Sequence, residues 1–87
     1  MSQDVSFKNR DRFIELGLTI AALRKLRGMS QEQLAEKAGI SRTFLSYIEA
    51  PNMVQVFSVD ILYNIADVLG IAAGDLLNTT LPGGKTD

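Results

Sequence analysis

Hydrophobic residues recur at three- and four-residue steps through most of this chain, the spacing that aligns apolar side chains on one face of an α-helix. Glycines and capping residues divide the pattern into segments of helical length. The sequence therefore predicts an all-α fold of five helices in one domain. The predicted helices lie at about residues 11–27, as a closely spaced pair within 30–49, at 59–69, and around 75–77.

The two ends of the chain lack this periodicity. Residues 1–10 are polar, and we expect a flexible arm there, followed by a first helix that Asn9 or Asp11 caps. Residues 79–87 contain a proline, two glycines and little apolar material, which is typical of a flexible tail. The folded domain is therefore expected to span residues 11–78.

The predicted first helix carries two apolar stripes. The first has the spacing of a core-facing surface and comprises Phe13, Leu16 or Gly17, Ile20 and Leu23. The second runs beside it and comprises Leu18, Ala22 and Leu26. This second stripe indicates either a wide core face or a surface that the N-terminal arm or another subunit covers.

Residues 30–49 predict two short helices joined by a tight turn. Ser30 and Gln33 have the spacing of a capping box at the start of the first helix. Gly39 stands where that helix must end in a left-handed conformation, and Ser41 can cap the second helix. Because so little chain separates the two caps, the helices must dock against each other at a steep angle. This is the helix-turn-helix arrangement, whose second helix can enter a DNA major groove.

Three segments carry a resemblance to a known family: LRKLRGMSQEQLAEKAGIS, LSYIE and DILYNIADVLGI. Through them, residues 13–78 resemble the Cro/repressor-type (XRE-type) helix-turn-helix regulators, which include lambdoid phage repressors. The resemblance implies a lambda-repressor-like fold and sequence-specific binding of double-stranded DNA as a small transcriptional regulator. The Arg-Thr-Phe stretch at 42–44 and the short chain look similar to restriction–modification controller proteins. A phage-type repressor and an antitoxin-type autoregulator are the near alternatives.

Composition narrows the function further. The 87 residues include neither cysteine nor histidine, so a thiolate zinc site or a catalytic triad cannot be assembled. We therefore predict a protein that is not an enzyme and that has no cofactor and no metal. No apolar run is long enough to span a bilayer and the N-terminus lacks a signal-peptide core, which predicts a cytoplasmic protein without membrane contact.

Charge is distributed unevenly along the chain. The net charge is −1, yet residues 1–42 carry eight Lys/Arg against five Asp/Glu, whereas residues 43–87 carry one against five. The basic half contains the start of the predicted recognition helix, where a DNA-binding face needs positive potential. In contrast, the connector 50–57 has no cation, which predicts a shallow salt dependence of DNA binding.

Helical spacing predicts which side chains of the recognition helix face outward. If Leu45 and Ile48 face the core, the outward-facing residues are Arg42, Thr43, Ser46 and Tyr47. The resemblance implies base contacts by Arg42, Thr43 and Tyr47, and the planar guanidinium of Arg42 fits guanine O6 and N7. Phe44 is expected to be partly exposed and either to touch DNA or to pack against the connector. The full predicted DNA-contacting set is Ser30, Gln31, Ser41, Arg42, Thr43, Phe44, Ser46, Tyr47 and Asn52.

Other side chains are predicted to bind the phosphates of DNA or to orient the recognition helix. Gln31 matches a family glutamine that contacts phosphate, and Asn52 could add a neutral hydrogen bond to phosphate. Arg24 and Glu49 resemble the family's buried ion pair between the first and third helices. Such a pair would orient the recognition helix.

A single helix-turn-helix reads only a few base pairs, so we expect a homodimer on a palindromic operator. The expected dimer interface is formed by Ile71, Leu76 and Leu77 around the fifth helix, and Leu18 and Leu26 are a second candidate surface. The bound dimer would block or recruit RNA polymerase, and an antitoxin-type protein would also bind a toxin partner. The rival prediction is a protein-interaction module that keeps the fold without binding DNA, which the uncharged connector favours.

Overall fold

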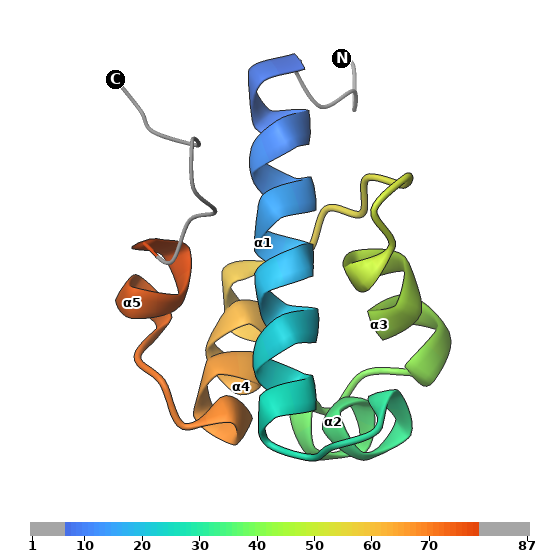
Figure 1. Cartoon of the computed structure of the whole chain (residues 1–87), viewed down its shortest axis with the longest axis vertical. Helices are drawn as coiled ribbons and strands as arrows, with labels where there is room; N and C mark the ends of the chain where they lie inside the picture. The colour runs from blue at the N-terminus through green and yellow to red at the C-terminus, as the bar shows by residue number, and fades with distance from the viewer. Residues whose placement is uncertain (1–6, 79–87) are drawn as a thin grey trace.

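The computed structural model describes residues 7–78, and within them the chain forms five α-helices (Figure 1). The helices are α1 (Phe7–Leu26), α2 (Gln31–Ala38), α3 (Arg42–Glu49), α4 (Val59–Leu69) and α5 (Ala73–Asn78). No strand occurs in this part of the chain, so the predicted all-α fold of five helices is confirmed. The predicted C-terminal tail and the first six residues of the predicted arm lie outside the described residues.

The long helix α1 runs through the middle of the molecule, with α3 on one side of it and α5 on the other (Figure 1). It begins at Phe7, so the predicted start near residue 11 and the predicted caps at Asn9 or Asp11 were wrong. The residues from Asn9 to Arg12 lie inside the helix and are exposed to solvent. Arg10 and Arg12 are good helix formers, so the helix can continue through this polar segment without a core to cover.

The core lies between α1 and the four shorter helices. Its most deeply buried side chains come from every helix: Ile20, Leu34, Leu45, Ile65, Leu69 and Leu76. Of the predicted stripe, Ile20 lies in this core, Leu16 and Leu23 pack against it and Gly17 is buried, while Phe13 is half-buried. Phe13 also meets Phe57 of the connector edge-on, with ring centroids 5.8 Å apart.

The structure corrects one part of the predicted dimer interface. Leu76 is only 1% exposed and packs in the core, so it cannot form a surface for another subunit. Its neighbour Leu77 is 54% exposed, and Ile71 is half-buried against the core. Adjacent helical residues point about 100° apart, so one of the two leucines must cover the core while the other faces solvent.

The local signals that define the helix ends were predicted correctly. Ser30 and Gln33 form the capping box, in which the Ser30 hydroxyl accepts from Gln33 N at 3.0 Å and Gln33 Oε1 accepts from Ser30 N at 2.9 Å. The Ser41 hydroxyl caps α3 by accepting from Phe44 N at 3.0 Å. Gly39 ends α2 with a φ of 78°, in the left-handed region that costs glycine little.

Two helix ends are also capped from a distance. Arg27 Nε, just after α1, donates to the carbonyl oxygen of Leu69 at the end of α4, at 2.8 Å. Asn64 Nδ2 of α4 donates to the carbonyl oxygen of Ala38 at the end of α2, at 3.3 Å. These bonds satisfy carbonyls that have no partner within their own helices.

None of the helices in the described part of the chain combines the length and the apolar character needed to cross a bilayer.

Candidate nucleic-acid interface

The candidate interface is the exposed side of α3, and its position depends on how α3 crosses α1. Leu45 and Ile48 of α3 are buried in the core. Where the helices cross, α1 contributes Gly17, and a Cβ placed there would overlap the carbonyl oxygen of Ile48. The absence of a side chain at Gly17 therefore lets the backbone of α3 lie directly against α1. The sequence placed this glycine in the core stripe but gave no sign of the close crossing.

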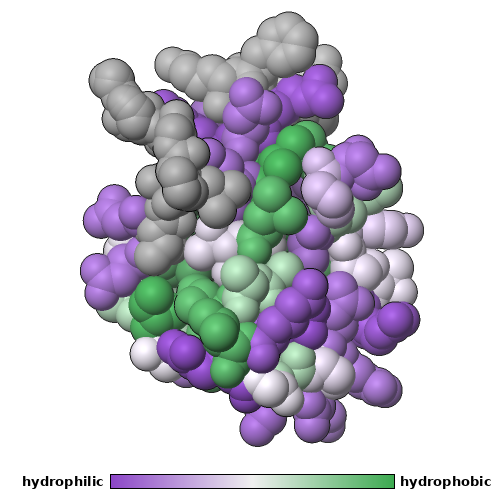
Figure 2. Space-filling view, viewed as in Figure 1, coloured by the Kyte–Doolittle hydropathy of each residue, from purple (hydrophilic) through white to green (hydrophobic). Residues whose placement is uncertain are grey.

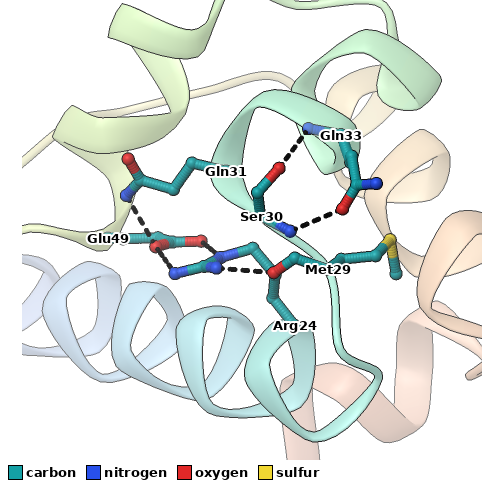
Figure 3. A network of polar contacts seen from close by, with 6 residues as sticks. All are labelled: Arg24, Met29, Ser30, Gln31, Gln33 and Glu49. Atoms are coloured by element: carbon teal, nitrogen blue, oxygen red, sulfur yellow. Dashed lines mark hydrogen bonds and ion pairs between the residues drawn. The ribbon is translucent and has the colours of Figure 1, made fainter.

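An ion pair fixes the C-terminal end of α3 to α1. Arg24 Nε donates to Glu49 Oε2 at 2.8 Å, and Arg24 Nη2 donates to Glu49 Oε1 at 3.0 Å (Figure 3). The third nitrogen, Nη1, donates to the carbonyl oxygen of Met29 at 2.8 Å. The two side chains are 10% and 5% exposed, so this bidentate pair is almost wholly shielded from water.

Gln31, the first residue of α2, joins the same network. Its Nε2 donates to Glu49 Oε1 at 2.9 Å, so Gln31 bridges the start of α2 and the end of α3 (Figure 3). The amide keeps a second hydrogen and its carbonyl oxygen for other partners. Gln31 was predicted to bind phosphate, and its bond to Glu49 could not be predicted because nothing local links residues 31 and 49.

The outward-facing residues of α3 fall into two groups. Arg42, Thr43 and Tyr47 are exposed, and Tyr47 keeps 42% of its surface accessible. In contrast, Ser46 is half-buried and its hydroxyl donates to the carbonyl oxygen of Thr43 at 2.7 Å. Phe44 is half-buried and packs against the core cluster. The exposed surface that α3 presents is therefore built mainly by an arginine, a threonine and a tyrosine.

The remaining predicted contact residues differ in whether their polar groups already form hydrogen bonds within the protein. Ser30 and Ser41 are exposed, but each hydroxyl already accepts a capping hydrogen bond. Asn52 is exposed in the connector between α3 and α4. Within the described residues, no group of three His, Cys, Asp or Glu side chains could hold a metal ion.

Helices α2 and α3 pack against each other across a tight turn, and α3 is anchored and presents polar side chains, which defines the helix-turn-helix class. The chain belongs to the helix-turn-helix family, of the XRE type, and the family model matches residues 20–76. The lambda-repressor-like fold predicted from the sequence is confirmed by the structural similarity to SinR, a member of this class.

Two bacterial regulators show the relationship in sequence. The chain is 43% identical over 60 residues to YazB of Bacillus subtilis, an uncharacterized HTH-type transcriptional regulator, with 69% of this chain and 84% of YazB covered. It is 38% identical over 63 residues to the HTH-type transcriptional regulator SinR of Bacillus licheniformis, with 72% of this chain covered. The match spans 56% of SinR, so this chain corresponds to about half of that protein.

A solved structure shows the relationship in three dimensions. The structure of SinR, the master regulator for biofilm formation, in complex with DNA matches this fold with a TM-score of 0.65 at 37% identity. The match covers 71% of this chain and 97% of that one. These relatives are transcriptional regulators, which agrees with the prediction of a protein that is not an enzyme. The narrower resemblance to restriction–modification controllers gains no specific support from them.

Proposed function

We propose that this chain regulates transcription by binding double-stranded DNA of defined sequence, as a homodimer on a palindromic operator. The observation that carries the proposal is the exposed set Arg42, Thr43 and Tyr47 on a helix whose opposite side is anchored. A recognition helix must present its side chains in a fixed orientation, because base readout depends on hydrogen-bond geometry. The solved complex of SinR with DNA supports the proposal.

Each exposed residue has a role that its chemistry suits. Arg42, at the start of α3, reads a guanine through two parallel hydrogen bonds. Thr43 packs its methyl group against a thymine methyl or bonds a phosphate, and the Tyr47 hydroxyl reaches a base edge or a phosphate. A cation in the first turn of a helix opposes the helix dipole, so a ligand explains Arg42 better than helix stability does.

The start of α2 contributes phosphate contacts. Gln31 has a second amide hydrogen available beside free backbone N–H groups of the first turn. Because the same side chain bonds Glu49, a phosphate held there is connected through one residue to the anchor of α3. Contact with the DNA backbone and orientation of the recognition helix are thereby coupled.

The dimer follows from the information that a regulator needs. One recognition helix contacts only a few base pairs, whereas two copies related by a two-fold axis read half-sites about 34 Å apart. Occupancy of such an operator blocks or recruits RNA polymerase. Exposed Met53 and Val56 on the cation-free connector favour the rival function, a protein-interaction module.

A selection of DNA from a random pool tests the function directly. The expected outcome is enrichment of a palindrome with half-sites one helical turn apart. On that operator Arg42→Ala should lose about 1–3 kcal/mol of binding free energy and relax the preference at one base position. Arg12→Ala, an exposed arginine at the far end of α1, is the matched control and should lose little.

Two outcomes would contradict the proposal. An unenriched pool would remove the DNA-binding function and leave the protein-interaction module. An equal loss by Arg42→Ala on operator and random DNA would show that this arginine contacts phosphate rather than a base.

A further inference from the structure

The outer face of α1 carries an apolar strip that lies outside the core and is partly exposed to solvent. The stripe predicted at Leu18, Ala22 and Leu26 lies away from the core: Leu18 is half-buried, Ala22 is exposed and Leu26 is 76% exposed. Half-buried Ile14 continues this strip toward the start of the helix. Figure 2 shows apolar atoms running down α1 and widening near its C-terminal end on the side of α4 and α5. The wide-core interpretation of this stripe is therefore excluded.

Two opposite charges bracket the strip symmetrically. Asp11 lies seven residues before Leu18 and Lys25 lies seven residues after it, so all three share one face of α1. Both charged residues are exposed, and neither forms an ion pair with another described residue. A helix face with a central leucine and opposite charges at equal distances is complementary to itself when two copies run antiparallel.

We propose that a second copy of this chain docks on the outer face of α1, with the two α1 helices antiparallel about a two-fold axis at Leu18. This inference rests on the proposed function, because it names the surface through which the operator-binding dimer forms. In this arrangement Leu18 meets Leu18 of the partner subunit, and Ile14 lies opposite Ala22 of the partner subunit. Asp11 lies opposite Lys25 of the partner subunit, and the same pair recurs by symmetry. A parallel arrangement would instead oppose like charges.

The position of α3 is compatible with this symmetry. In Figure 1, α3 lies on one side of α1 and α5 on the other, while the strip faces the viewer in the same orientation in Figure 2. The two-fold axis lies in front of α1, is perpendicular to the helix and points toward the side of α3. Rotation about this axis gives a second α1 that runs in the opposite direction. It leaves both α3 helices on the same side of the dimer. An operator-binding dimer needs its two recognition helices on one side, where they can reach the same duplex.

The competing surface at α5 is less suited to self-association. Of the leucines predicted there, Leu76 belongs to the core and Leu77 is exposed. The helix carries one acidic residue, Asp75, and no basic residue. Two copies of α5 would therefore bring together carboxylates without a cation from either helix to offset them.

Cysteine cross-linking distinguishes the two surfaces, because the natural chain has no cysteine. Residues beside a two-fold axis can reach the short Cβ–Cβ distance that a disulfide requires. Under mild oxidation Leu18→Cys should give a covalent dimer, whereas Leu77→Cys, the matched control, should stay largely uncoupled. The reverse pattern would overturn the proposal in favour of α5, and a lack of coupling in both would overturn it as well.

A charge-reversal series tests how the two α1 helices are aligned in the dimer. It uses the chain without introduced cysteines, so no disulfide holds the subunits together. Asp11→Lys and Lys25→Asp should each raise the dimer dissociation constant by about tenfold or more in sedimentation equilibrium, because like charges then face each other. The double variant should restore dimerisation, since each pair is opposite in charge again. Both positions are exposed, so circular dichroism should show an unchanged fold. Failure of the double variant to recover would refute the antiparallel pairing.

Measurements of DNA binding test the α1 dimer surface and the proposed DNA-binding function separately. Leu18→Glu should remain monomeric and should still bind a single half-site, while losing the extra affinity that the palindrome gives the wild-type chain. A Leu18→Glu variant that stays dimeric would refute the α1 surface and leave DNA binding intact. A wild-type chain that cross-links through Leu18→Cys but selects no DNA would refute the function and leave the surface intact.

Discussion

The short helices α3 and α5 both pack against α1, yet they are secured in different ways. Helix α3 has a side-chain cap, two buried apolar residues, a buried ion pair and a direct backbone approach at Gly17. Helix α5 has one buried residue, Leu76. The comparison indicates that α3 is constrained in position and rotation, whereas α5 mainly closes one side of the core. Only the first kind of constraint can hold side chains in register with DNA bases.

Removing the ion pair should produce the largest change. In Glu49→Ala, Arg24 keeps its charge almost fully buried without its carboxylate partner, which should cost about 3–5 kcal/mol of unfolding free energy. Thermal or urea denaturation measures the loss, and operator affinity should fall with it because α3 loses its anchor. The control is the double variant Arg24→Met and Glu49→Met, which removes both charges and should recover much of the stability. An unchanged melting temperature in Glu49→Ala would show that the anchor is dispensable.

Gly17 tests the close crossing of α1 and α3. Gly17→Ala adds a Cβ that overlaps the carbonyl oxygen of Ile48, so the two helices must separate at the cost of about 3 kcal/mol. Gly74→Ala is the matched control, because a Cβ at Gly74 meets no atom within 4 Å. Alanine favours a helix more than glycine does, so Gly74→Ala should be neutral or slightly stabilising. Equal stability of the two variants would remove the crossing as a cause of the rigidity of α3.

Truncation of Leu76 should cause the smallest loss of stability among these substitutions. Leu76→Ala should lower the free energy of unfolding by about 2–3 kcal/mol, near the lower end for a buried leucine, because a terminal helix can shift into part of the cavity. Operator affinity measured well below the melting temperature should change little, since α5 does not position α3. If Leu76→Ala weakened DNA binding as much as Glu49→Ala, the distinction between the two helices would fail.

Most of the features that could be predicted from the sequence are local ones, and the buried Arg24–Glu49 pair is an exception that the family resemblance supplied. The capping box at Ser30, the turn at Gly39 and the cap at Ser41 each depend on a few neighbouring residues, and these signals define the helix-turn-helix. The role of Leu76 could not be predicted, because a helix of six residues is too short for apolar spacing to fix which leucine faces inward. The bond from Gln31 to Glu49 and the crossing at Gly17 depend on how distant helices meet.

The bonds that cap α2 and α4 from a distance have a consequence for how the domain comes apart. When the last turn of α4 opens, the carbonyl oxygen of Leu69 leaves the guanidinium of Arg27. When α4 detaches, the end of α2 loses the amide of Asn64. Fraying of one helix end therefore also breaks a hydrogen bond to a residue outside that helix, so it does not remain a local event. Amide protons in α2, in α4 and at the C-terminal end of α1 should consequently exchange with solvent in one shared opening rather than helix by helix.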